Sequence, residues 1–158
     1  MKLEWSTTTA GVKMPQIIYG TAWKEERTTD LVVQAVQAGF RGIDTACQPK
    51  HYQESLVGEA LALLAEEGIA REDLFLQTEQ VDSLVRHSPL ETHDLLMEVW
   101  TAMEKVHDAG GARQLGISNC YDPAVLADLH QDARVKPAVV QNRFFQTTDY
   151  DRYLRGWC

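Results

Sequence analysis

Four residues of the chain could together carry out proton transfer. Asp44, Glu79 and His87 each stand at the end of a short apolar segment or directly after one, and Tyr52 precedes a helical segment. If these segments are neighbouring strands, Asp44 and Glu79 would lie close together, and crowded carboxylates raise one another's pKa. A protonated carboxylic acid, a phenol and an imidazole around one pocket form an acid–base set that needs no cofactor. Such a set could isomerise, dehydrate or cyclise a small carbonyl-bearing metabolite.

Alternating strands and helices must position these side chains. Residues 2–14 predict a β-hairpin that turns at Thr9-Ala10-Gly11. Period-2 and period-3.6 apolar patterns then alternate, which favours a largely parallel sheet or barrel. The expected strands are 16–20, 41–45, 74–78, 82–87, 113–118 and 137–144; the expected helices are 28–39, 53–68, 91–109 and 123–133; the residues after 144 are expected to be a short polar tail.

Helix ends are marked by their usual residues. The two threonines at 28–29 are expected to cap the first helix, Gly39 to end it, and Asp122-Pro123 to start the last one.

One junction breaks the alternation of strands and helices, because only three residues separate Thr78 from Asp82, whereas a parallel crossover needs about a dozen or more. The two segments therefore form one long bent strand or pair through a tight reversal.

Composition favours a globular protein of one domain, residues 1–158. Hydrophobic residues make up 44% of the 158 residues, and the formal net charge of −8 argues against nucleic-acid and anionic-membrane partners. No apolar run is long enough for a transmembrane helix, and we expect no signal peptide. An odd number of cysteines (Cys47, Cys120, Cys158) without metal-like spacing suggests a reducing, cytoplasmic setting. The histidines form no ligand pattern, so no metal is expected.

Five segments in register resemble the aldo-keto reductases. They are GFRGIDTACQPKHYQESLVGEAL, REDLFLQT, RHSP, ARQLGISNC and AVVQNRF. The resemblance runs from residue 19 to about residue 144 and implies a (β/α)₈ barrel. Against that family the chain is expected to be a truncated member, since it lacks the third helix and the segments after the sixth strand.

The resemblance assigns roles to several residues. The family uses an aspartate, a tyrosine acid, a lysine and a histidine, which Asp44, Tyr52 and His87 match, while Glu79 stands at the lysine position. A strict register counted back from Glu54 would place His51 rather than Tyr52 at the tyrosine position. Positions that hold the NADPH cofactor in the family are matched by Gly20, Thr21, Trp23, Ser118, Asn119 and Gln141.

Each of these residues also has a structural explanation. Asp44 could cap a turn, Tyr52 could be a surface aromatic residue, and Glu79 could be a solvated loop residue. His87 could bond to the backbone at a strand end. The matches to the cofactor site could be inherited without binding a ligand.

Three function classes follow from these observations. A tyrosine acid needs a nearby cation at neutral pH, and Glu79 would instead raise its pKa. This favours cofactor-independent acid–base chemistry at Asp44, Tyr52, Glu79 and His87. The alternatives are an NADPH-dependent carbonyl reductase and an inactive pseudoenzyme with a binding role. About six strands cannot close an eight-stranded barrel, and the open edges predict a homodimer.

Overall fold

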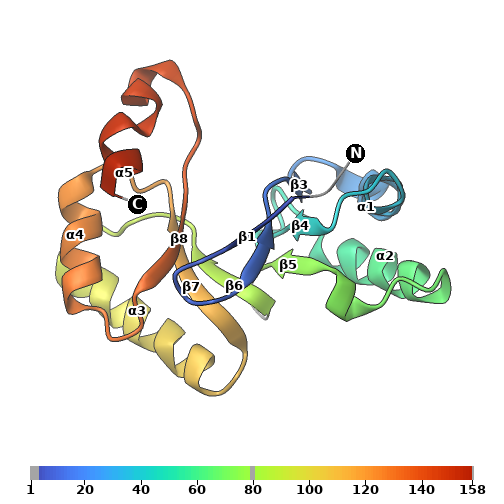
Figure 1. Cartoon of the computed structure of the whole chain (residues 1–158), viewed down its shortest axis with the longest axis horizontal. Helices are drawn as coiled ribbons and strands as arrows, with labels where there is room; N and C mark the ends of the chain where they lie inside the picture. Colours follow the sequence, from blue (N-terminus) through green and yellow to red (C-terminus); the bar gives the residue numbers. More distant parts are fainter. Residues whose placement is uncertain (1–3, 79–80, 158) are drawn as a thin grey trace. The chain divides into compact units, whose positions relative to one another are not determined.

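The computed structural model of the protein describes residues 4–78 and 81–157. The chain divides into two compact units, Met1–Asp82 and Ser83–Cys158. Each unit contains parallel strands and helices (Figure 1). Each unit also has a hydrophobic core of its own. The single domain expected from the sequence stays a prediction.

The first unit opens with the expected hairpin. Strands β1 (Trp5–Thr7) and β2 (Lys13–Pro15) pair in antiparallel register, and Gly11 occupies the turn with a φ of 77°. A positive φ costs glycine little because it has no Cβ. Strands β3 (Ile18–Gly20), β4 (Gly42–Asp44) and β5 (Phe75–Gln77) then pair in parallel, so that Gly20 is opposite Asp44 and Asp44 is opposite Gln77. The carboxyl ends of these three strands are therefore level with one another.

Two helices cover the sheet of the first unit. Helix α1 (Thr28–Gln37) follows the short 3₁₀ helix η1 (Glu25–Arg27), and α2 (Glu54–Glu66) precedes η2 (Arg71–Asp73). Their buried side chains pack around Ile43 of β4, as the period-3.6 pattern predicted. The buried stripe of α2 consists of Val57, Ala60 and Leu64, and Leu56 next to it is half-buried.

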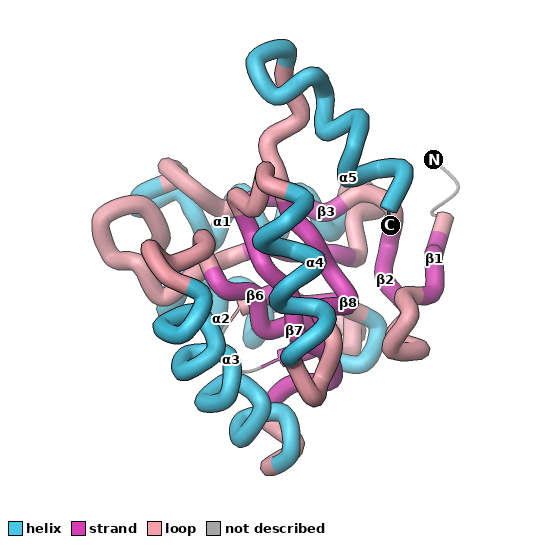
Figure 2. Tube along the Cα trace, turned by 90° about the vertical axis from the view of Figure 1, so that its left-hand side faces the viewer, coloured by secondary structure: helices cyan, strands magenta, loops and turns pink. Residues whose placement is uncertain are grey.

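The second unit is organised around Trp100. Its elements are β6 (Val81–Arg86, which begins in the first unit), α3 (His93–Asp108), β7 (Ala112–Ser118), α4 (Pro123–Asp132), β8 (Pro137–Gln141), η3 (Gln146–Asp151) and α5 (Arg152–Trp157). Strands β7 and β8 are parallel, and α3 and α4 lie beside each other on one side of them (Figures 1 and 2). Trp100 of α3 is completely buried in the larger core cluster.

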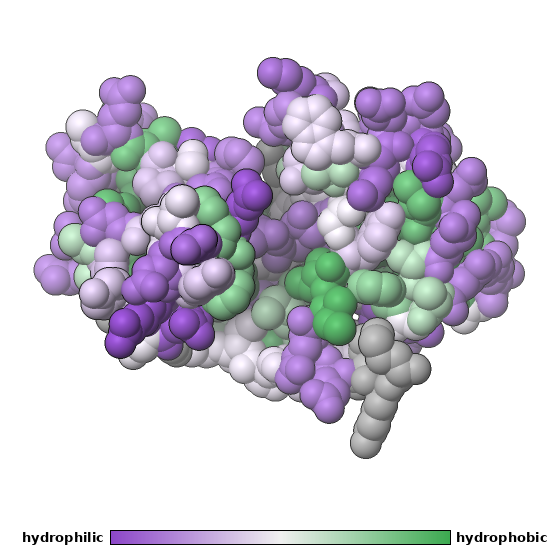
Figure 3. Space-filling model, turned by 90° about the horizontal axis from the view of Figure 1, so that it is seen from above, coloured by the Kyte–Doolittle hydropathy of each residue, from purple (hydrophilic) through white to green (hydrophobic). Residues whose placement is uncertain are grey.

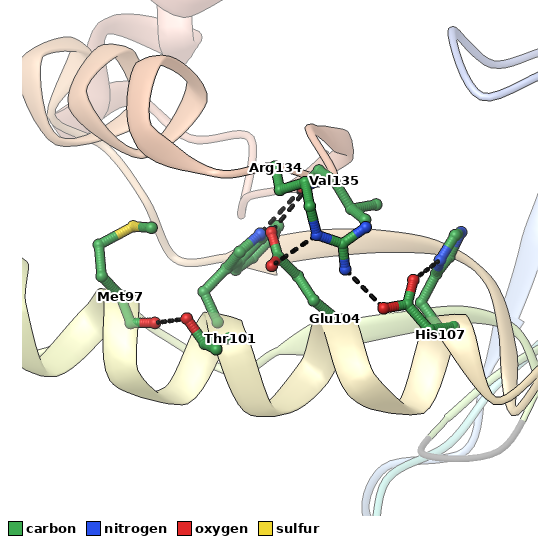
Figure 4. Close-up of polar contacts among 8 residues, drawn as sticks. Met97, Thr101, Glu104, His107, Arg134 and Val135 are labelled. Carbon is green, nitrogen blue, oxygen red and sulfur yellow. Dashed lines mark hydrogen bonds and ion pairs between the residues drawn. The ribbon is translucent and has the colours of Figure 1, made fainter.

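A polar network ties α3 to the segment that leads into β8. The buried carboxylate of Glu104 accepts a hydrogen bond from the Val135 backbone N–H at 2.9 Å and pairs with Arg134 at 3.5 Å (Figure 4). Arg134 also contacts Asp108 at 2.7 Å, and the Trp100 indole N–H donates to the Val135 carbonyl at 2.9 Å. Because a buried carboxylate is costly without partners, these contacts fix the start of β8.

The junction between β5 and β6 has one described anchor. Asp82 is buried, and its Oδ2 accepts a hydrogen bond from the Leu76 backbone N–H at 2.9 Å and pairs with Arg71 at 3.2 Å. The start of β6 therefore lies beside β5. Residues 79–80 lie outside the described residues, so the form of the connection stays a prediction.

Two expectations about local structure were wrong. Arg27 occupies the N-cap position of α1 without a side-chain capping bond, and the Thr28 hydroxyl donates to the Glu25 carbonyl of the preceding 3₁₀ turn at 2.6 Å. The residues after 144 are not a polar tail, because they form η3 and α5 and bury Leu154 in the core of the second unit. Rings of Phe144 and Tyr150 also pack at 5.0 Å between centroids.

Hydrophilic side chains dominate the face drawn in Figure 3, with smaller apolar patches between them. Within residues 4–78 and 81–157, no helix combines the length and the apolar character that crossing a membrane requires.

Candidate functional site

The carboxylate of Asp44 is held at the carboxyl end of β4. The Gln77 side-chain amide, which is buried at the end of β5, donates to Asp44 Oδ1 at 2.7 Å. On the other side, the buried Thr21 donates to the Asp44 carbonyl through its hydroxyl at 2.9 Å and through its backbone N–H at 3.0 Å. Residues at the ends of β3 and β5 therefore both contact Asp44, and the printed bond to its carboxylate comes from Gln77.

The negative charge of Asp44 affects the pKa of Tyr52. The pKa of the Tyr52 phenol is raised above its usual 10.0, first by burial and second by the negative charge of Asp44. Both causes disfavour the phenolate. At neutral pH the phenol therefore keeps its proton and can donate it only as a weak acid.

Removing the charge of Asp44 should lower the pKa of Tyr52. In an Asp44→Asn variant we expect that pKa to fall but to stay above 10.0, because burial is the larger cause and remains. The ultraviolet absorbance of tyrosinate, titrated for this variant, the unchanged protein and their Tyr52→Phe derivatives, would isolate the signal. A Tyr52 pKa that does not move would show that Asp44 and Tyr52 are not coupled.

The raised pKa of Tyr52 also makes the stability of the protein depend on pH. A raised pKa in the folded state means that this group favours folding below pH 10.0, and that the contribution is lost as the pH rises through the raised value. In the Asp44→Asn variant this loss should still begin near pH 10.0, but it should be smaller and complete at a lower pH.

The second candidate for the tyrosine position, His51, has different surroundings. Its ring packs against the indole of Trp23 with 4.1 Å between centroids. Its backbone carbonyl accepts a hydrogen bond from the Trp23 backbone N–H at 2.8 Å. Trp23 itself is 66% exposed and has a φ of 62°, a strained value for a tryptophan. Tyr52 is thus the residue coupled to Asp44, but its assignment to the family's tyrosine position stays a prediction.

A second set of candidate residues is assembled at strand ends in the second unit. The Ser118 hydroxyl at the end of β7 donates to the carbonyl of Gln141, the last residue of β8, at 2.7 Å. The Asn119 side-chain amide donates to the backbone carbonyl of His87 at 2.7 Å, and the Asn119 backbone N–H donates to the Gln141 carbonyl at 3.1 Å. The three cofactor-site matches Ser118, Asn119 and Gln141 therefore lie together, and His87 lies with them.

The predicted residues fall into one set in each unit. Gly20, Thr21, Trp23, Asp44 and Tyr52 belong to the first unit, and His87, Ser118, Asn119 and Gln141 belong to the second. Gly20 is the exposed last residue of β3, and a Cβ added there would meet open space. Glu79 lies outside the described residues.

Two residues of the second set were missed by the sequence analysis. The side-chain amide of Asn142 forms a reciprocal pair with the backbone of Cys120, accepting from its N–H at 2.9 Å and donating to its carbonyl at 2.8 Å. The Tyr121 hydroxyl donates to Asn119 Oδ1 at 3.5 Å. Asn142 stands directly after Gln141 inside AVVQNRF, and Tyr121 directly follows ARQLGISNC, but their positions alone do not mark them as site residues.

Nucleophilic thiol chemistry is not supported at Cys120. Burial and, second, the charge of Asp122 raise the pKa of its thiol to about 11, so that it stays protonated at neutral pH. Among the described residues, no three His, Cys, Asp or Glu side chains form a group that could hold a metal ion.

Parallel strands that alternate with helices, with polar side chains at the carboxyl ends of the strands, are the arrangement of (β/α)₈-barrel proteins. Comparison with known proteins shows which family within this fold class the chain resembles. Residues 74–150 match the model of the aldo/keto reductase family. A crystal structure of an aldo/keto reductase from Brucella melitensis is 28% identical, with a TM-score of 0.82 over 99% of this chain and 70% of that one.

Curated relatives agree with this assignment. An NAD(P)H-dependent D-xylose reductase of Pyricularia oryzae is 28% identical over 83% of this chain and 56% of its own length. Glyoxal reductase of Bacillus subtilis is 29% identical over 94% of this chain and 60% of its own. The chain matches the aldo-keto reductase family over residues 74–150, and its fold is that of part of the (β/α)₈ barrel. It spans little more than half the length of these curated relatives.

Proposed function

We propose that the chain acts as an NAD(P)H-dependent reductase of small carbonyl compounds. The observation that carries this proposal is the hydrogen-bonded set of Ser118, Asn119 and Gln141 at the ends of β7 and β8. These residues match the family positions that hold the nicotinamide. The relatives support the proposal, since they are named as NAD(P)H-dependent and glyoxal reductases, and one solved structure of the same fold was crystallised with NADPH.

The hydrogen-bonding groups of Ser118, Asn119 and Gln141 fit the carboxamide of the nicotinamide. That group has an NH₂ that needs acceptors and a carbonyl that needs a donor. Asn119 and Gln141 each carry an amide with both kinds of group, and Ser118 carries a hydroxyl that can also accept. When bound, the dinucleotide would supply a hydride. In the second unit, the chain itself would orient the carboxamide at Asn119. In the first unit, Tyr52 carries a phenol that its raised pKa keeps protonated.

The hypothesis of cofactor-independent acid–base chemistry receives less support than the reductase proposal. It rested on Glu79 and on segments that the chain lacks relative to the family, and no relative named above is an isomerase, lyase or cyclase. The comparisons support an NAD(P)H cofactor for this family rather than its absence. The reductase alternative therefore replaces acid–base chemistry as the main proposal.

A titration of the purified chain with NADPH, followed by calorimetry, tests this function. We expect a Gln141→Ala variant to bind NADPH about three- to tenfold more weakly, the effect of one or two hydrogen bonds. Gln131→Ala is the matched control, because Gln131 is an exposed glutamine at the end of α4. Absence of NADPH and NADH binding at hundreds of micromolar would refute the proposal.

We also propose that the chain forms a homodimer. Among the described strands of their own units, β3 pairs only with β4 and β8 only with β7, so each offers an unpaired edge. Sedimentation velocity should show a dimer at micromolar concentration, and a monomer there would refute this part of the proposal.

A further inference from the structure

The side chain of Asn119 is oriented by partners that allow only one arrangement. The backbone carbonyl of His87, 2.7 Å from one end of the amide, can only accept a hydrogen bond. The amide nitrogen must therefore face His87, and its other N–H reaches Ser118 Oγ at 3.3 Å. Both donors of Asn119 are then in use, and its oxygen Oδ1 faces the other way.

The hydroxyl of Tyr121 is also fixed in direction. The backbone N–H of Arg143, which can only donate, donates to the Tyr121 oxygen at 3.2 Å. The phenol proton therefore has to point elsewhere, and Asn119 Oδ1 is the acceptor at 3.5 Å. The Tyr121 ring is held in turn by Phe145, with 6.1 Å between centroids in an edge-to-face arrangement.

A chain of one-way hydrogen bonds thus runs from Arg143 through Tyr121 and Asn119 to His87. Asn119 has a φ of 51°, an unusual conformation that needs support from its surroundings. The Asn142 amide provides part of that support by pairing with both backbone groups of the next residue, Cys120.

We infer that Tyr121 is a positioning residue for the nicotinamide, and that it does so by aiming Asn119 Oδ1 at the carboxamide NH₂. An amide oxygen accepts two hydrogen bonds, so Oδ1 retains acceptor capacity after Tyr121 has donated to it. Tyr121 does not touch the reacting atoms. Its effect reaches the cofactor through the direction and polarity of the Asn119 amide, and the inference rests on the proposed function.

The inference predicts selectivity for one feature of the cofactor. A Tyr121→Phe variant keeps the ring and its contact with Phe145 but loses the hydroxyl. We expect it to bind NADPH about three- to tenfold more weakly. The reduced 3-acetylpyridine analogue of NADPH carries a methyl group in place of the NH₂, so its affinity should change less than about twofold. Tyr153→Phe is the control, since Tyr153 is 75% exposed.

Calorimetric titration of both cofactors into the three proteins separates the outcomes. Selective loss of NADPH affinity in Tyr121→Phe supports the inference. An equal loss for both cofactors would mean a merely structural role, and no loss would mean no role; either result overturns the inference while leaving the proposed function intact. If the unchanged protein binds neither cofactor, the proposed function and the inference fall together.

A cofactor-free measurement tests the same orientation. In ¹H–¹⁵N spectra, the side-chain amide of Asn119, identified with an Asn119→Asp variant, should shift in Tyr121→Phe and stay in place in Tyr153→Phe. An Asn119 signal that is unchanged in Tyr121→Phe would contradict the hydrogen bond on which the inference depends.

Discussion

Replacing Trp100 by alanine is expected to lower the free energy of unfolding by about 3–5 kcal/mol, the usual cost of removing a large aromatic side chain from a core. Trp100 is completely buried in the core cluster of the second unit. Its indole N–H also donates to the Val135 carbonyl at 2.9 Å, beside the bond from the Val135 N–H to Glu104 (Figure 4). A loss of this size is a large fraction of the stability of a typical domain.

Urea unfolding followed by circular dichroism would measure this loss. Trp100→Phe should cost less than Trp100→Ala, because a phenyl ring still fills part of the space of the indole, although the hydrogen bond to Val135 is lost. Trp23→Ala is the matched control, since Trp23 is 66% exposed and its replacement should change stability by less than about 1 kcal/mol. Similar losses for Trp23→Ala and Trp100→Ala would contradict the core described above.

Local signals in the sequence predicted most of the elements. Gly39 has a φ of 108° just beyond α1, and the Asp122 side chain accepts from the Ala124 N–H at 2.9 Å with Pro123 at the first helical position. Residues with such narrow conformational preferences mark helix ends without reference to the rest of the chain. The hairpin turn at Gly11 was predictable for the same reason.

The segment after residue 144 could not be predicted in this way. Its helix α5 is only six residues long, too short to show a period, and Leu154 is buried because the core of the second unit covers it. The close approach of β7 and β8 is equally hidden in the sequence. A Cβ on Gly116 would lie 2.8 Å from the Val139 carbonyl oxygen, which explains this glycine only once the pairing is known.

In the candidate site, too, some residues could be predicted from the sequence and others could not. The resemblance indicated Asp44, Tyr52, Ser118, Asn119 and Gln141, because each stands in a motif. It assigned no role to Tyr121 or to Asn142, although Asn142 stands inside AVVQNRF, since the backbone groups of Arg143 and Cys120 that they contact lie 22 residues away in the chain. Side chains that bond to backbone groups of a distant element leave no pattern in a single sequence, and only the folded chain brings them together.

A Glu79→Lys variant is expected to reduce small carbonyl compounds at least tenfold faster than the unchanged protein at neutral pH, since competent general acids contribute about 10²–10⁴-fold. The family register, rather than the structure, assigns Glu79 to the lysine position. A cation there would oppose the two causes that raise the pKa of Tyr52, which are burial and the charge of Asp44. The phenol would then become a better acid.

Initial rates of NADPH oxidation with an excess of a small aldehyde would measure the change. Glu79→Gln removes the negative charge without adding a cation and should give an intermediate rate. Glu72→Lys is the matched control, because it makes the same charge change at an exposed position in η2 and should leave the rate unaltered.

If Tyr52 is the proton donor, the rate increase in Glu79→Lys depends on its phenol. Adding Tyr52→Phe to Glu79→Lys should therefore remove the increase, whereas adding His51→Gln should preserve it. The opposite pattern would assign the tyrosine position to His51, which packs on Trp23. An increase that survives both additions would mean that residue 79 acts on cofactor binding rather than on proton transfer, and the NADPH affinity of Glu79→Lys would then have to rise by the same factor.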